Sequence, residues 1–258
     1  MVAGWEGCEF ALVGGRVRRQ GEDVLKVGDG PPACLGRHGR AVLVHRSAPV
    51  LTVGVDRSAV ETALRGGELG CPALGCGGRL APWGFARTRR VRGAAGRLRP
   101  RRAVCTGCGR THVLLPASVL WRRADAVTVI GAALLAKTAG WGHRRVAARV
   151  DRPPSTVRGW LRRIGRIADR VLGVLAAAAA QFGAEFVAPT PTADPVGSVV
   201  ELVGALARAA ARRLGGSCSP WRLATVLCGG RLLAPTGPDL WSGVGVAGNT
   251  SWPWAGDP

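Results

Sequence analysis

Two short runs of β-favouring residues mark where a clear hydrophobic pattern begins in the chain. They span 41–45 and 50–55, and aliphatic, β-branched runs of this length are typical of strands. A short helix should follow, with Asp56 or Ser58 as its cap, because short oxygen-bearing side chains accept from the first free N–H groups of a helix. Residues 1–40 show little periodicity, and we predict that they are poorly ordered.

From residue 125 onward the apolar positions follow a helical period. The run 126–138 is apolar nearly all round, which predicts a buried helix. The Pro-rich stretch 189–195 is a predicted linker, and Ser219 before Pro220 predicts a helix start with a capping hydroxyl. The predicted helices are 126–138, 143–150, 155–175 with a kink at Gly165, 196–214 and 219–228.

The charge of the chain is strongly uneven. There are 36 basic and 16 acidic residues, which give a net charge of +20. Residues 79–170 alone hold 21 Arg and Lys137 against three Asp, a net of +19. Such an excess attracts polyanions, nucleic acid first. Because the excess lies in one central third, a general bias of composition does not account for it.

Four cysteines have the spacing of metal ligands. Cys71 and Cys76 form one pair, Cys105 and Cys108 a second, and Gly follows each pair. Tetrahedral zinc binds thiolates that converge from two tight turns, so the pairs predict a zinc ribbon with one Zn²⁺. Buried reduced cysteines are the alternative. His112 could replace a ligand, although a surface histidine is the simpler interpretation.

The sequence shows no signal for export or membrane insertion. The first ten residues carry Glu6 and Glu9 in place of a basic start followed by an apolar run. The longest apolar stretches, 126–136 and 171–180, are short or dominated by Ala, below the 18–20 or so residues that a span requires. We therefore expect a cytoplasmic, nucleoid-associated protein in which thiols stay reduced.

The helix predicted from residue 155 separates into two faces on a helical wheel. Val157, Trp160, Ile164 and Ile167 share the apolar face, and arginines occupy the other. Together with 143–150 and the turn at 151–154, this is the pattern of a helix-turn-helix, whose second helix presents its first residues to the major groove. The alternative is an ordinary amphipathic surface helix whose charged face is simply exposed to solvent. The residues predicted to contact bases are Ser155, Thr156 and Arg158, and those predicted to contact phosphates are Arg144, Arg145, Arg152, Arg162, Arg163 and Arg166.

These elements predict an α+β fold: a small β zinc ribbon, then a mainly α helix-turn-helix (tri-helical) domain and C-terminal helices. The Ala-rich C-terminal helices leave two roles open, a homodimer contact or an extension of the core. The predicted divisions are a poorly ordered segment 1–40, a lead-in 41–70, the ribbon 71–116, the helix-turn-helix domain 120–175, an Ala-rich helical region 176–233 and a disordered tail 234–258.

Three segments together resemble a known family. They are Cys-Pro-…-Cys-Gly-Gly-Arg-Leu-Ala-Pro-Trp-Gly (71–84), Arg-Pro-Arg-Arg-Ala-Val-Cys-Thr-Gly-Cys-Gly-Arg-Thr-His-Val-Leu-Leu-Pro (99–116) and Gly-His-Arg-Arg-Val-Ala-Ala-Arg (142–149). They resemble an uncharacterised actinobacterial family that pairs a zinc ribbon with a helix-turn-helix similar to the DNA-binding front end of insertion-sequence transposases. The resemblance covers about 41–175. It implies DNA binding, with the four cysteines as zinc ligands.

No catalytic machinery is evident, so we expect a DNA-binding protein and not an enzyme. A transposase nuclease domain needs three carboxylates that hold two metal ions on a mixed sheet. After residue 175 the acidic residues are too few and lie in the linker, the tail or stretches without β-rich runs. The predicted role is a transcription regulator or a mobile-element DNA binder, with double-stranded DNA as partner and no small-molecule substrate. A transposase-derived protein or remnant that acts with a separate catalytic subunit is the alternative, and RNA binding is less favoured because aromatic stacking residues are scarce.

Overall fold

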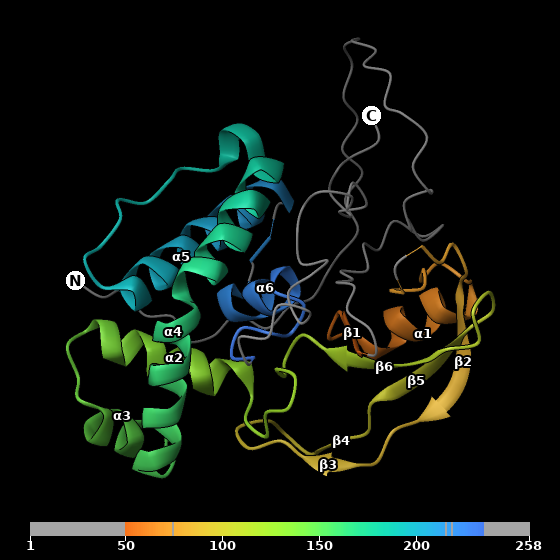
Figure 1. Cartoon of the computed structure of the whole chain (residues 1–258), viewed down its shortest axis with the longest axis horizontal. Coiled ribbons are helices and arrows are strands. Elements are labelled where there is room, and N and C mark those ends of the chain that lie inside the picture. The colour runs from red at the N-terminus through yellow and green to blue at the C-terminus, as the bar shows by residue number, and fades with distance from the viewer. Residues whose placement is uncertain (1–49, 74, 215, 218, 235–258) are drawn as a thin grey trace.

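The computed structural model describes residues 50–73, 75–214, 216–217 and 219–234. Over these residues it is an α+β structure, 48% helical and 17% strand. A small sheet with one covering helix forms one side of the molecule, and a group of helices forms the other (Figure 1). The segments predicted at 1–40 and 41–45, and the tail from 235 onward, lie outside the described residues.

The sheet contains four strands in the order β1-β6-β5-β2. Strands β2, β5 and β6 are antiparallel neighbours, whereas β1 pairs in parallel with β6. The pairing of β1 in this sheet was not part of the sequence prediction. The bounds are β1 Val50–Val53, β2 Leu80–Phe85, β5 Arg101–Cys105 and β6 Thr111–Pro116.

Helix α1, Arg57–Arg65, follows β1 and packs beside β2. Its N-cap is Asp56, whose carboxylate accepts from the N–H groups of Ser58 and Ala59 at 2.9 and 3.1 Å, so the predicted cap is confirmed. Val60 and Leu64 are buried on its inner face. They complete one apolar core with residues of the sheet and the loop before β2, namely Leu51, Val53, Leu69, Leu80, Ala103 and Leu114.

A short hairpin is inserted between β2 and β5. Its strands are β3, Arg89–Arg90, and β4, Arg97–Leu98. Val91 is buried in a second small core, against which Leu98 packs. The backbone of Arg92 also bonds in both directions to the segment before the first helix of the helical part, because its N–H donates to Ala124 and its carbonyl accepts from Ala126. The hairpin is therefore held to the helical part as well as to the sheet.

The helices of the second part share one large core. Those predicted from periodicity are present, with most ends within one residue of the prediction. The long helix α4 extends further than predicted and passes through Gly165 without interruption. The bounds are α2 Val127–Thr138, α3 His143–Arg149, α4 Pro154–Ala179, η1 (a 3₁₀ helix) Ala180–Glu185, α5 Pro195–Leu214 and α6 Pro220–Leu227.

Two details at the C-terminal end of the helical part differ from the sequence prediction or extend it. Ser219 is the N-cap of α6, but its hydroxyl makes no capping hydrogen bond, so the predicted hydroxyl cap is wrong. The turn after α6 also reaches the sheet side, since the carbonyl of Gly230 accepts from the N–H of Trp121 at 2.8 Å. A Cβ at Gly230 would lie 2.9 Å from the hydroxyl oxygen of Thr52 in β1.

One helical stretch, Pro154–Ala184, is long and apolar enough to cross a membrane by length and composition alone. The sequence prediction had placed every apolar run below that length. The stretch is weak evidence for a span, because core helices of soluble proteins pass the same test. Here its apolar residues, among them Trp160, Ile164 and Leu175, are buried in the shared core of the helical part.

Candidate functional site

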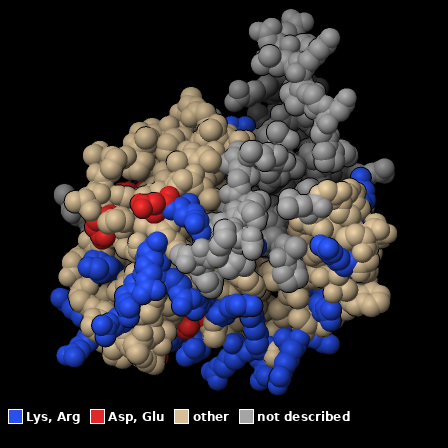
Figure 2. All heavy atoms as spheres, viewed as in Figure 1, with Lys and Arg blue, Asp and Glu red and all other residues tan. Residues whose placement is uncertain are grey.

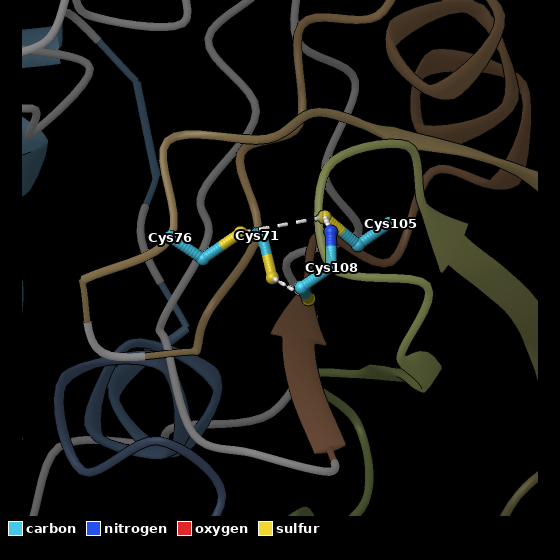
Figure 3. Close-up of side chains that lie close together, drawn as sticks. All are labelled: Cys71, Cys76, Cys105 and Cys108. Atoms are coloured by element: carbon cyan, nitrogen blue, oxygen red, sulfur yellow. Dashed lines mark hydrogen bonds between the residues drawn. The ribbon is translucent and has the colours of Figure 1, made fainter.

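Four cysteine side chains converge at one end of the sheet (Figure 3). All four sulfur atoms lie within 4.8 Å of one another. The Sγ atoms of Cys71 and Cys108 are 3.7 Å apart, and those of Cys76 and Cys105 are 3.6 Å apart. A disulfide would require about 2.0 Å, whereas four sulfurs at about 2.3 Å from a central Zn²⁺ form a tetrahedron with edges of about 3.8 Å. The four thiols are thus close enough to hold a metal ion.

Two glycines allow the loops that carry the cysteines to approach each other closely. A Cβ at Gly78 would lie 2.5 Å from Cys105 Sγ and 2.9 Å from the Cα of Gly107. Cys105 ends β5, and its sulfur accepts from the N–H groups of Gly107 and Cys108 at 3.3 and 3.4 Å. Cys71 Sγ accepts in the same way from Ala73. Backbone N–H groups aimed at sulfur favour the thiolate, which is the metal-binding form.

The local environment separates the acidities of the cysteines. Burial raises the pKa of Cys71 to about 12, although the N–H of Ala73 works against it. Burial also opposes ionisation of Cys105, but hydrogen bonds from Cys108, Gly107 and the neighbouring thiols outweigh it and lower the pKa of Cys105 to about 6. Of these two thiols, Cys105 is therefore the one that ionises more readily. A bound divalent cation would favour the fully ionised set.

His112 lies directly behind the cluster, and the prediction of a surface histidine is wrong. It is 1% exposed, and its Nε2 is 3.6 Å from Cys71 Sγ. Burial, helped by the charge of Arg110, lowers the pKa of His112, so its ring is neutral at pH 7. A neutral ring with its proton on Nε2 donates to the Cys71 sulfur, as outer-shell partners of metal ligands do. The sequence contained an indication of this burial. His112 and Leu114 are two positions apart in a strand, so they lie on the same face of the sheet.

Among the described residues, the remaining cysteine, Cys228, does not join this cluster. Cys228 is fully buried in the helical core, and burial raises its pKa to about 12. Cys8, Cys34 and Cys218 lie outside the described residues. The described part of the chain therefore holds one four-cysteine cluster, which consists of the residues that the spacing predicted.

The residues predicted to contact DNA lie on α3, in the turn that follows it and on the first half of α4, and the two helices pack together. On α4 the apolar residues Val157, Trp160 and Ile164 are buried, as the wheel predicted. The opposite face is exposed, and Figure 2 shows basic side chains over this part of the molecule. The exposed members of the predicted set are Arg144, Arg145, Ser155, Arg158, Arg162 and Arg166, and Thr156 is half-buried.

Three of the predicted phosphate contacts have partners within the protein. Arg152 is only 10% exposed in its side chain, and its Nε donates to Asp125 at 2.6 Å, so the structure gives it a role inside the fold in place of a phosphate contact. Arg163 is half-buried and donates to the carbonyl of Leu233. Arg145 is exposed and stacks on the ring of Trp141, 3.9 Å from its centroid. Arg145 thus keeps an accessible guanidinium, whereas Arg152 does not.

Asp125 is the residue near this surface that sequence reasoning missed. It is 3% exposed and pairs with both Arg152 and Arg92, the latter at 3.4 Å. It was nevertheless detectable as the only acidic residue between positions 79 and 150. A single carboxylate among so many arginines is expected to pair with some of them. Because Asp125 is buried, these ion pairs belong to the interior of the fold.

Comparison of the chain with protein-family models, with curated proteins and with solved structures finds no match. Two features of its own structure are available for an assignment of function. They are the four-cysteine cluster and the arginine-covered face of α3 and α4.

Proposed function

We propose that this protein binds double-stranded DNA through a helix-turn-helix formed by α3 and α4, and that its cysteine cluster holds one zinc ion in a ribbon. The observation that carries the proposal is the exposed face of α4. That face presents Arg158, Arg162 and Arg166 one helical turn apart, and α4 has no acidic residue before Asp169. Surface helices that only confer solubility mix charges of both signs, which this face does not do before Asp169.

The connection between α3 and α4 supports a helix-turn-helix. Ala147 on α3 is 1% exposed, and a small residue there lets the two helices pack closely. Asp151 in the turn has φ +51°, a left-handed conformation that Gly adopts most readily and that Asp tolerates. A tight turn of this kind, often with Gly, joins the two helices of the motif. Ser155 and Arg158 then lie in the first turns of the second helix, which enters the major groove in such proteins.

The choice of zinc follows from the ligand set. Four thiolates at tetrahedral spacing suit Zn²⁺ better than the oxygen-preferring Mg²⁺ or Ca²⁺. With all four positions taken by cysteine there is no open coordination site, so the ion would have a structural role. It would fix the loops before β2 and after β5 and thereby stabilise the sheet.

The proposal is tested by in vitro selection of duplex DNA with the full chain, purified with zinc. Binding of a selected duplex should weaken steeply with salt, because released counterions accompany each neutralised phosphate. The variant Arg158→Ala/Arg162→Ala should lose most of this binding. The variant Arg65→Ala/Arg208→Ala removes the same charge from exposed positions on α1 and α5 and should bind nearly as well as the wild type. Equal losses in the two variants, or no duplex binding by the wild type, would overturn the proposal.

A further inference from the structure

The β3–β4 hairpin carries an arginine surface that the DNA-binding helices do not account for. One side of the hairpin is packed, since Val91 is buried and Leu98 rests against the same small core. The exposed side consists of arginines. The exposed members of this hairpin surface, on the strands and the flanking residues, are Arg87, Arg90, Arg92, Arg97 and Arg99.

Two of these arginines lie directly opposite each other. Arg90 of β3 is the register partner of Arg97 of β4, and like charges at directly opposed positions destabilise an antiparallel pair. Among the described residues, neither Arg90 nor Arg97 forms an ion pair with a carboxylate. The hairpin thus keeps an arrangement that its own stability disfavours. An anionic partner outside the chain would neutralise both charges together.

The hairpin is fixed relative to α4 by the buried carboxylate of Asp125. This carboxylate pairs with Arg92 just after β3 and with Arg152 in the turn that precedes α4. The backbone hydrogen bonds of Arg92 to Ala124 and Ala126 add to this link. Gly93, at φ +79°, brings the hairpin turn so close to α2 that a Cβ there would overlap Val129. The hairpin and the start of α4 therefore keep one relative position.

Both basic surfaces lie along one edge of the molecule. Figure 1 shows α3, the start of α4 and the β3–β4 hairpin along the lower edge, and Figure 2 shows Lys and Arg side chains covering that edge. A long, uniformly charged partner that contacts α3 and α4 along this edge would pass the hairpin as well. Duplex DNA has this form, with a negative charge about every 1.7 Å of its axis.

We propose that the β3–β4 hairpin is a second DNA-contacting element, which binds the phosphate backbone of the duplex beside the segment whose bases α4 contacts. The inference rests on the proposed function of α3 and α4. Arg90 and Arg97 supply the contacts, and Asp125 sets the spacing between the two elements. Contacts to phosphate position a protein on DNA and carry no sequence information of their own, so the hairpin adds affinity and length of contact without altering the preferred bases.

The test compares wild type with Arg90→Ala/Arg97→Ala on a selected duplex, by hydroxyl-radical footprinting and by salt titration. In the variant the protected region should shorten at one flank only, with the preferred core sequence unchanged. The loss of two phosphate contacts reduces the log–log salt slope by about 1.8, so the ratio of affinities at 50 and 200 mM salt falls about tenfold. Wild type and variant should bind alike on a duplex cut back to the core. The variant Arg65→Ala/Arg208→Ala serves as the control of equal charge.

A second variant separates binding from stability. Arg97→Glu places an opposite charge across from Arg90, so the hairpin should become more stable and the melting temperature should not fall, while DNA affinity drops. If wild type binds the duplex and the Arg90→Ala/Arg97→Ala variant keeps its full footprint and slope, the hairpin inference is overturned and the proposed function stands. If wild type binds no duplex, both are overturned.

Discussion

Asp125 and Arg152 form an ion pair that is almost completely excluded from solvent, with side-chain exposures of 4% and 10%. Nε of Arg152 donates to Oδ1 of Asp125 at 2.6 Å. Removal of the carboxylate leaves the buried guanidinium with only the exposed carboxylate of Asp151, 3.8 Å from its Nη1, and loss of a buried partner typically costs about 3–5 kcal/mol. We therefore expect Asp125→Ala to lower the free energy of unfolding by about this amount in urea denaturation.

Two further variants complete this experiment. Asp169→Ala removes an exposed carboxylate from α4 and should change the free energy of unfolding by less than about 0.5 kcal/mol. Asp125→Ala combined with Arg152→Met removes both charges and should recover much of the loss, because the uncompensated charge is the source of the cost. If the double variant is as unstable as Asp125→Ala alone, the ion pair is not the cause.

The cysteine cluster predicts one tightly bound metal ion per chain. Elemental analysis of the purified protein should identify this ion as zinc. Cys105→Ser should abolish stoichiometric metal, because four ligands become three thiolates and a weak hydroxyl. Cys228→Ala removes a thiol from the helical core and should leave the metal content unchanged. Chelation should unfold 71–116 while the circular dichroism of the helices persists, since α2 to α6 have their own core. Zinc-free protein with an unchanged sheet would contradict the prediction.

Adjacent glycines offer a sharper test of the cluster geometry. Gly78→Ala would place a methyl group 2.5 Å from Cys105 Sγ and 2.8 Å from the backbone nitrogen of Gly107, so the two loops must separate. We expect metal affinity, measured by competition with a chromogenic chelator, to fall at least tenfold. Gly77→Ala is the matched control, because a Cβ at Gly77 meets nothing within 4 Å. Equal affinities in the two variants would show that the loops do not need this close approach.

A second glycine pair tests the helical core. A Cβ at Gly131 of α2 would overlap the indole ring of Trp221 on α6. Gly131→Ala should lower the free energy of unfolding by about 1–3 kcal/mol, the usual cost of overpacking. Gly173→Ala, on the exposed side of α4 with nothing within 4 Å, should raise it by about 0.5–1 kcal/mol, because Ala favours the helix. Thermal and urea unfolding would show the opposite signs.

Arg158 and Arg162 should differ in what they contribute to DNA binding. Arg158 lies near the start of α4, where a bidentate pair with guanine can discriminate by about 1–3 kcal/mol, so Arg158→Ala should change the preferred sequence. Arg162, one turn further along, should contact phosphate, and Arg162→Ala should weaken binding to all duplexes and reduce the salt slope by about one. Titration of selected and scrambled duplexes at several salt concentrations measures both effects. Identical behaviour of the two variants would count against reading of the groove by α4.

Local patterns in the sequence were sufficient for the features that depend on neighbouring residues. The cap at Asp56 and the buried face of α4 follow from residues three or four positions apart. The cysteine cluster followed because each pair is local and a metal needs both pairs. For the cap and the helix face the physical cause acts within one helical turn, and for the cysteines it acts within each pair, while the two pairs meet across the fold.

Apart from the cysteine cluster, features that join distant parts of the chain were not predicted. The parallel pairing of β1 with β6 involves no tight turn between the two strands, so no local sequence pattern indicates it. The contact of Arg152 with Asp125 depends on the packing of α2 against α3, so a guanidinium that looks free in the sequence is held within the fold. The helical period of 143–150 indicated where a helix forms and not which of its flanking side chains stay accessible.

The parallel pairing of β1 also sets an order of events during synthesis. Val50 pairs with Val113, so β1 and α1 leave the ribosome long before the strand that completes their sheet. At a synthesis rate of roughly 5–20 residues per second, Leu51 and Val53 of β1 remain unpaired for several seconds before β6 is made. If the cysteines hold the proposed metal ion, its capture would close the intervening loop and lower the entropic cost of bringing the strands together. In zinc-starved cells the newly made chain would therefore spend longer with an unpaired apolar strand, and aggregation of nascent protein would precede any loss of metal from finished molecules.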